Sequence, residues 1–152
     1  MPFTAAVLMC LVVHVSDGDS LFARCHESDS AATWPVKIRI ANIDAPELKQ
    51  QYGGESKAHL ERLCLGRTAE ITPVTRDQYE RLVAHVRCDG SDAAEAQLRD
   101  GLAWVYTWRS KSIPALQTLQ DSAQERRIGL WSEARPQAPW NYRKQHRPYS
   151  ND

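Results

Sequence analysis

The sequence has no excess of charge of either sign, no paired-cysteine motif and no long hydrophobic run. Lysine plus arginine and aspartate plus glutamate number 19 each among 152 residues, so the formal net charge is zero. A polyanionic partner would therefore need a local cluster of arginines, because no overall basic field attracts it. None of the five histidines has the spacing of a metal site or a catalytic triad, which leaves carboxylates and arginines to carry any chemistry.

The cysteine pattern argues against a structural zinc site, because no CxxC pair is present. The four cysteines are Cys10, Cys25, Cys64 and Cys88. Small buried hydrophobic side chains are one interpretation, typical of a cytosolic protein. If instead Asp17 and Gly18 are the central residues of a tight hairpin, the register places Cys10 opposite Cys25, close enough for a disulfide. We leave localisation open and favour secretion or the periplasm over the cytoplasm.

Length and composition indicate one globular domain. Hydrophobic residues make up 42% and charged residues 25% of the chain, as in ordinary folded proteins. The apolar segment Met1 to Val15 lacks a basic n-region and is too short to span a bilayer, so we expect a first strand there. We expect a domain over 1–134 and, over 135–152, an irregular tail rich in proline, arginine and aromatic residues that either packs back on the domain or is frayed. We also expect a monomer and no membrane contact.

Hydrophobic periodicity predicts five strands and three helices. The expected strands are Val7 to Val15, Leu21 to Cys25, Val36 to Ile43, Thr68 to Pro73 and Leu82 to Cys88. The expected helices are Glu55 to Leu65, Ala93 to Asp100, and one that Ser112 caps and that extends to about Arg127. Helices inserted between strands three and four and after strand five are the layout of an OB-fold, an α+β barrel whose surface commonly binds nucleic acid.

Two acidic turns suggest the chemistry. Asp17-Gly18-Asp19 follows the first strand, and Asp44-Ala45-Pro46-Glu47 follows the third, which carries Arg39. Alone, the first motif is typical of a hairpin turn and the second of a helix N-terminus. Together at the mouth of a small β-structure, the carboxylates could hold a hard divalent cation against a phosphate. The combination points to phosphodiester chemistry.

The motifs, taken in chain order from about Val12 to Trp131, resemble the thermonuclease family, also called staphylococcal nuclease-like domains. The residues that carry the resemblance are Asp17-Gly18-Asp19-Ser20, Arg39, Ile43-Asp44-Ala45-Pro46-Glu47, Asp77-Gln78-Tyr79-Glu80-Arg81-Leu82-Val83-Ala84, Gly101-Leu102-Ala103-Trp104-Val105 and Gly129-Leu130-Trp131. The segment Ala138-Pro139-Trp140-Asn141-Tyr142-Arg143 is similar to a tail common in bacterial members.

The resemblance implies a calcium site and a catalytic acid. By it, the side chains of Asp19 and Asp44 and the main-chain carbonyl of Ala45 bind Ca²⁺, and Glu47 activates or orients the attacking water. Calcium prefers six to eight oxygen ligands, so this small set leaves positions for water and phosphate. A carboxylate near the nucleophile is suited to accept its proton.

The resemblance also implies how phosphate is held. Arg39 and Arg81 match the family's catalytic arginines, and Tyr79 matches a tyrosine that contacts a terminal phosphate. A guanidinium suits a phosphate that gains negative charge during reaction. The expected activity is hydrolysis of DNA and RNA with little sequence preference, leaving 3′-phosphate ends.

Some positions depart from the family pattern. Ala45 replaces a threonine whose hydroxyl supports the metal's waters, and Glu80 replaces a glycine and adds negative charge near the substrate. A nucleic-acid or protein-binding module that no longer cuts is therefore an alternative, and a small-anion or nucleotide-binding protein is a third. Aromatic residues at Trp104, Tyr106 and Trp108 could stack on bases, although packing is the favoured role for tryptophan here. We expect the basic tail, Arg143 included, to be solvated.

Overall fold

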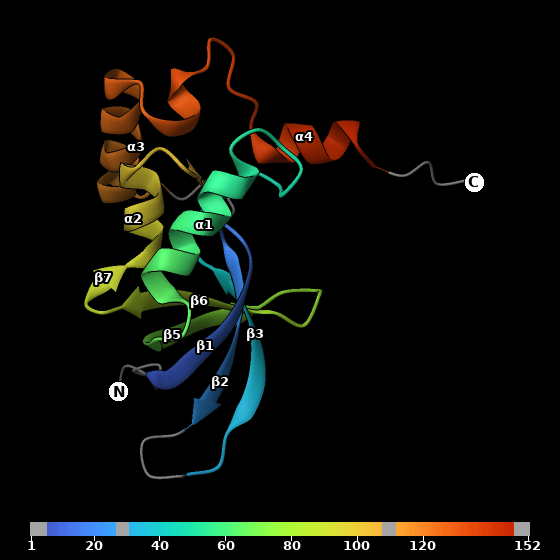
Figure 1. The fold of residues 1–152 in the computed structure, drawn as a ribbon, viewed down its shortest axis with the longest axis vertical. Helices are drawn as coiled ribbons and strands as arrows, with labels where there is room; N and C mark the ends of the chain where they lie inside the picture. Colours follow the sequence, from blue (N-terminus) through green and yellow to red (C-terminus); the bar gives the residue numbers. More distant parts are fainter. Residues whose placement is uncertain (1–5, 27–30, 108–111, 148–152) are drawn as a thin grey trace.

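Five strands close into a barrel in the computed structural model, which describes residues 6–26, 31–107 and 112–147 (Figure 1). Their order is β3 (Trp34–Ile40), β2 (Ser20–His26), β1 (Leu8–Asp17), β5 (Thr68–Arg76) and β6 (Leu82–Cys88). Parallel pairing of β3 with β6 joins the two ends of this series. The predicted α+β OB-fold barrel is confirmed.

The hairpin of β1 and β2 differs from the prediction at its turn but not at its cysteines. The turn residues are Gly18 and Asp19, one position later than predicted. Two register shifts each add one residue to β1 relative to β2. These shifts offset the displaced turn, so Cys10 still lies opposite Cys25 and forms a disulfide with it. The predicted pairing is confirmed.

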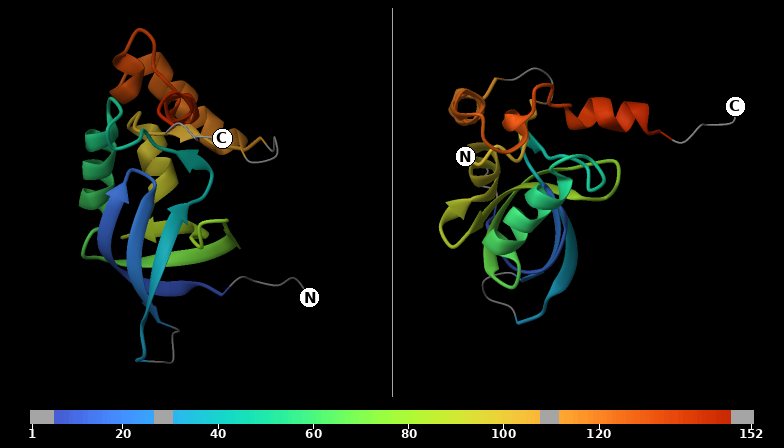
Figure 2. Two further views of the ribbon diagram at one scale, coloured as in Figure 1. Left: turned by 90° about the vertical axis from the view of Figure 1, so that its right-hand side faces the viewer. Right: turned by 45° about the horizontal axis from the view of Figure 1, so that its top comes forward.

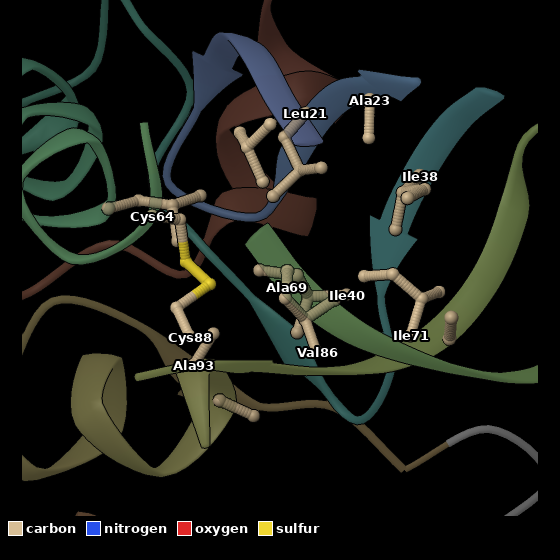
Figure 3. Packing of buried hydrophobic residues seen from close by; sticks show 14 of the residues in the cluster. Leu21, Ala23, Ile38, Ile40, Cys64, Ala69, Ile71, Val86, Cys88 and Ala93 are labelled. Carbon is tan, nitrogen blue, oxygen red and sulfur yellow. A yellow bond between two sulfur atoms is a disulfide. The ribbon is translucent and has the colours of Figure 1, made fainter. Parts of the chain in front are cut away.

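Three helices pack beside the barrel, and a second disulfide ties one of them to it. The helices are α1 (Gly53–Cys64), α2 (Ala93–Arg99) and α3 (Pro114–Arg126). Cys64 at the end of α1 is bonded to Cys88 at the end of β6 (Figure 3). The sequence did not predict this bond, because its partners lie on different elements 24 residues apart.

The barrel interior is filled by alternating apolar residues from its strands, as the period-two pattern predicts. Figure 3 shows buried side chains of this interior, with the Cys64–Cys88 bond at one side of them. The largest fully buried apolar side chains of the strands are Val12, Val15, Leu21, Ile38, Ile40, Ile43, Ile71 and Val86. This rigid interior fixes the strand ends from which the acidic turns emerge.

The predicted third strand is broken before the second acidic motif. β3 ends at Ile40, and Asn42 adopts a φ of 71°, which turns the chain away from the barrel. A separate short strand, β4 (Ile43–Asp44), then pairs with β8 (Trp104–Val105). Asp44 is therefore held in a second small sheet opposite Trp104 rather than at the end of a barrel strand.

The C-terminal segment contains a helix where an irregular tail was expected. A 3₁₀ turn, η2 (Gly129–Ser132), leads to α4 (Pro139–Gln145), so the described residues form four α-helices instead of the predicted three. Proline starts both α3 and α4, and α3 begins at Pro114 rather than after a Ser112 cap. Figure 2 shows α4 extending away from the barrel at the end of the molecule that also carries α3. Among the described residues, none of the helices is long and apolar enough to cross a membrane.

Candidate active site

The first hairpin turn and the segment after β4 meet through Asp19. Its Oδ2 accepts a hydrogen bond of 2.7 Å from the Ala45 N–H, and its Oδ1 accepts one of 2.9 Å from the Ser20 hydroxyl. Asp19 and Asp44 are 5% and 1% exposed, respectively. Two acidic residues 25 positions apart in the sequence thus lie buried side by side, and burial of charge at this density requires cationic partners.

Arg39 supplies one such partner. Its Nη1 lies 3.3 Å from Asp19 Oδ2, and its Nη2 lies 3.6 Å from Asp44 Oδ1. The same Nη1 donates hydrogen bonds to the carbonyl oxygens of Ile40, at 2.9 Å, and Ile43, at 2.8 Å. Ile40 is the last residue of β3 and Ile43 is the first residue of β4. The interruption between the two strands therefore supplies the carbonyls that orient the guanidinium between the two acids.

The turn that carries Asp19 is held by close backbone packing at Gly18. A Cβ at this position would lie 1.8 Å from the Ser56 hydroxyl and 2.8 Å from the Ala45 Cβ, so only glycine fits. The Gly18 carbonyl accepts a 2.7 Å hydrogen bond from the buried amide of Gln97. Ser56 of α1 and Gln97 of α2 thus hold the turn in place. Their close approach explains why the residue between Asp17 and Asp19 is a glycine.

Glu47 lies at the rim of the same cluster. Its N–H donates to the Gln50 side-chain oxygen at 3.1 Å, and the Gln50 N–H donates to the Glu47 carbonyl at 2.8 Å. A Cβ at Gly53 would lie 2.0 Å from that carbonyl, so the start of α1 packs directly on the Glu47 backbone. The Glu47 side chain is 34% exposed, which leaves it open to water.

Arg143 of α4 completes the cluster, although no role in the site was predicted for it. Its Nη2 donates to Asp44 Oδ2 at 2.7 Å, and its Nη1 donates to Asp44 Oδ1 at 3.0 Å and to Glu47 Oε1 at 2.8 Å. Arg143 was expected to be solvated. It reaches Asp44, 99 residues earlier in the chain, only because α4 docks there. The resemblance of Ala138 to Arg143 to a tail of bacterial family members assigned this arginine no role.

Burial and neighbouring negative charge raise the pKa of two acids in the cluster. Burial raises the pKa of Asp44, an effect that the Arg143 hydrogen bond opposes and the Asp19 charge reinforces. Burial, followed by the charge of Asp19, raises the pKa of Asp17 to about 7, with a further contribution from Glu47. Asp17, which was predicted only as part of a turn, is a further acid of the site. The site therefore favours added positive charge.

Arg81 and Tyr79 belong to a separate contact in the structure. The Arg81 Nε donates to Asp77 Oδ2 at 2.7 Å, and its guanidinium lies 5.4 Å from the centre of the Tyr79 ring. Arg81 directly precedes β6, the strand that runs parallel to the Arg39 strand. Leu82 and Val83, the next two residues, pair with Ile38 and Arg39, but the Arg81 side chain is held by Asp77. Glu80 has a φ of 62°, the left-handed conformation that explains why glycine suits this position.

The oxygen atoms of this cluster suit a hard divalent cation that takes only some of its ligands from the protein. In the part of the chain that the structure describes, no three His, Cys, Asp or Glu side chains group as a metal site. The resemblance assigns the metal to the carboxylates of Asp19 and Asp44 and the carbonyl of Ala45, which are ligand types that calcium prefers. Guanidinium groups from Arg39 and Arg143 touch these carboxylates, so positive charge is already drawn to this position.

The tryptophans near the site pack against one another. Trp104 forms edge contacts with Trp131, at 4.5 Å between ring centroids, and with Trp140, at 5.5 Å. The favoured packing role for tryptophan fits these contacts, which also link β8 to α4. Trp108, the other tryptophan considered for base stacking, lies outside the described residues.

Comparison with known proteins places this chain in a family. A family model described as staphylococcal nuclease homologue matches residues 37–133. A protein of Escherichia coli O157:H7 named "Uncharacterized endonuclease" is 38% identical over 143 residues, which cover 93% of this chain and 89% of that protein. A Haemophilus influenzae protein of the same name is 33% identical over 138 residues, covering 91% of this chain and 74% of the relative.

A plant relative matches over a shorter region. "Staphylococcal-like nuclease CAN1" of Arabidopsis thaliana is 35% identical over 111 residues, which cover 73% of this chain but 34% of the plant protein. The chain thus corresponds to about a third of that longer protein and to most of the bacterial ones. The family model and these relatives together show that the chain belongs to the staphylococcal nuclease homologues.

Proposed function

We propose that this protein is a calcium-dependent nuclease that hydrolyses phosphodiester bonds of DNA and RNA with little sequence preference and leaves 3′-phosphate ends. The observation that most supports this is the buried pair Asp19 and Asp44, which one guanidinium of Arg39 reaches at 3.3 and 3.6 Å. The names of the bacterial and plant relatives, endonuclease and nuclease, agree with that class of activity.

Asp19, Asp44 and the carbonyl of Ala45 would hold the calcium ion. When bound, the ion would supply positive charge to a phosphoryl oxygen of the substrate. The few protein ligands leave coordination positions for water and phosphate. The loss of a threonine hydroxyl at Ala45 does not remove a ligand in this arrangement, because only the backbone oxygen is required there.

The remaining residues act on the substrate directly. Arg39 would donate hydrogen bonds to phosphate oxygens as negative charge builds on them, a form of electrostatic stabilisation that preorganised donors provide. Glu47, exposed at the rim, would accept a proton from the attacking water. Arg81 would exchange Asp77 for substrate phosphate and act as the second guanidinium, with Tyr79 beside it contacting a terminal phosphate.

Digestion assays test the proposal. Plasmid, single-stranded DNA and RNA are incubated with the full chain with calcium and with a chelator, and Glu47→Gln is compared with Glu55→Gln, an exposed acid of α1. We expect cutting to need calcium and Glu47→Gln to lower the rate by about 10²- to 10⁴-fold, while Glu55→Gln leaves it unchanged. Cutting in the presence of chelator, or an undiminished rate for Glu47→Gln, contradicts the proposal.

The non-cutting binding module has its own signature in the same assay. The observations that favour it are the Arg81 side chain held by Asp77 and the negative charge at Glu80. If the protein binds DNA at high calcium without forming products, this alternative replaces the nuclease proposal.

A further inference from the structure

Arg143 occupies the carboxylate that the proposed calcium site requires. Its two terminal nitrogens contact both oxygens of Asp44, at 2.7 and 3.0 Å, and one of them also contacts Glu47 Oε1 at 2.8 Å. Charge-assisted hydrogen bonds of this length in a two-pronged arrangement are among the strong ones in proteins. In this structure Asp44 is fully engaged by a cation that belongs to the chain itself.

A divalent cation bound to Asp44 would be repelled by the Arg143 guanidinium. Calcium–oxygen distances are about 2.3–2.6 Å, so a calcium ion on Asp44 would lie within a few ångströms of the Arg143 charge. Asp44 is 1% exposed, and repulsion between two cations is poorly screened at a buried site. The two cations therefore compete for one carboxylate.

The contacts of α4 allow such an exchange. Pro139 is its single buried residue, and the Arg143 side chain is 43% exposed. A pocket of about 200 Å³ lies between the loop after Glu47 and the segment that leads to α4, and Tyr142 is the one residue of α4 that lines it. A helix with few buried contacts has a low free energy of local opening.

The segment before α4 provides a fixed point for its movement. The Gln50 amide donates a 2.7 Å hydrogen bond to the Gln137 carbonyl, and Ala138 is buried. Trp140 adds the edge contact with Trp104. These contacts lie at the first turn of the helix, whereas Arg143 lies in its last turn. The helix is therefore anchored at one end and linked to the acids at the other.

From this geometry we propose that Arg143 is a built-in competitor of the divalent cation, and that α4 acts as a latch that holds Asp44 and Glu47 until the cation displaces it. The inference rests on the proposed calcium-dependent function. In the latched form Glu47 is paired and not free to accept a proton from water. Calcium binding would release both Arg143 and Glu47, so the same event that fills the metal site would also free the catalytic acid.

Calcium affinity measured by titration calorimetry tests the competition. The full oxidised chain is compared with Arg143→Gln and with the matched control Lys144→Gln, which removes the same charge from the adjacent exposed position. Among the described residues, Lys144 has no carboxylate partner within ion-pair distance. We expect Arg143→Gln to bind calcium about tenfold more tightly, because a charged hydrogen-bonded competitor is removed, and Lys144→Gln to match the parent chain.

Amide hydrogen exchange of 139–145 supplies a readout that does not depend on activity. In the parent chain, calcium should speed exchange at α4, and in Arg143→Gln exchange should be fast with or without calcium. If Arg143→Gln binds calcium no more tightly than the parent chain, or if calcium leaves α4 exchange unchanged, the latch is overturned while the calcium site stands. If neither protein binds calcium, the metal part of the proposed function fails, and the latch fails with it.

Discussion

Asp19 and Asp44 lie so close together that the single guanidinium of Arg39 contacts both, with Nη1 3.3 Å from one carboxylate and Nη2 3.6 Å from the other. Asp19 lies in the first hairpin turn and Asp44 in β4, and each is nearly inaccessible to water. Loss of the Arg39 bridge would leave buried charge that Arg143 compensates only at Asp44.

Arg39→Lys should therefore impair both catalysis and stability. A lysine has one charged nitrogen and cannot reproduce the contacts to two acids and two carbonyls. We expect the cleavage rate to fall by about 10²- to 10³-fold and the free energy of unfolding to fall by about 1–3 kcal/mol. Rates and urea unfolding are compared with Arg24→Lys, an exposed arginine on β2. Equal effects in the two variants would show that the bridge has no special role.

The close approach of Gly53 to the Glu47 backbone gives a prediction with a built-in control. Gly53→Ala would place a methyl group 2.0 Å from the Glu47 carbonyl and force the loop to move, whereas the Gly54 Cβ position meets nothing within 4 Å. We expect Gly53→Ala to lower the cleavage rate at least tenfold, because small displacements of a catalytic group are costly. Gly54→Ala should retain activity and change stability by no more than about 1 kcal/mol.

Enzyme kinetics with both variants check this displacement, and circular dichroism verifies that each remains folded. If Gly53→Ala and Gly54→Ala have the same rate, the position of Glu47 does not depend on the packing of α1, and its proposed role as proton acceptor loses structural support.

The two disulfides should contribute strongly to stability. They close loops with separations of 15 and 24 residues, so removal of either is expected to cost about 3 kcal/mol. Urea unfolding of Cys10→Ala/Cys25→Ala and Cys64→Ala/Cys88→Ala measures this cost. Reductant should cause a larger loss of stability in the parent chain, which has two bonds to lose, than in either double variant, which has one.

We propose from these bonds that the protein acts in an oxidising compartment, as secreted and periplasmic proteins do. Alkylation of thiols in the native host, without prior reduction, should modify none of the four cysteines. Complete labelling of the folded protein would contradict both the bonds and the proposed location.

Asp77 predicts a pH dependence of stability. Burial alone would raise its pKa, but hydrogen bonds from the backbone and side chain of Arg81 and from the Tyr79 N–H lower it below the usual value. A lowered folded-state pKa means that the folded protein favours the charged carboxylate. This contribution is present above the unfolded pKa of 3.8 and is lost as the pH falls through the lower folded value.

Asp77→Asn should consequently be less stable than the parent chain at neutral pH, and the difference should shrink as the pH falls below about 4. Unfolding free energies measured from pH 7 to pH 2 test this, with Asp121→Asn on α3 as a control for loss of charge. A difference that stays constant over the whole range would show that the charge on Asp77 does not contribute through its contacts with Arg81.

The sequence predicted the barrel and the local origin of the acids because those features depend on neighbouring residues. Alternating apolar residues define the strands, and glycine at position 18 is required where the turn packs against α1. The break between β3 and β4 was not predicted because the residue that adopts the left-handed conformation there is Asn42 and not a glycine. Its outcome, Asp44 paired in a second sheet, depends on Trp104 far along the chain.

Features that depend on tertiary docking were not predictable from local pattern. The Cys64–Cys88 bond requires α1 to end beside β6, and Arg143 reaches the acids only because α4 docks beside the loop that carries Glu47. A basic, proline-containing tail has the composition of a solvated segment, and nothing within it reveals the carboxylates that it contacts.

The calcium dependence of cleavage in Asp19→Asn tests the central claim most directly. Initial rates on a defined oligonucleotide are measured across a calcium series for the parent chain, Asp19→Asn and the control Asp121→Asn. We expect the parent and control rates to rise with calcium and saturate together, and Asp19→Asn to need at least tenfold more calcium, since a charged ligand is lost. An unchanged calcium requirement in Asp19→Asn would contradict the account.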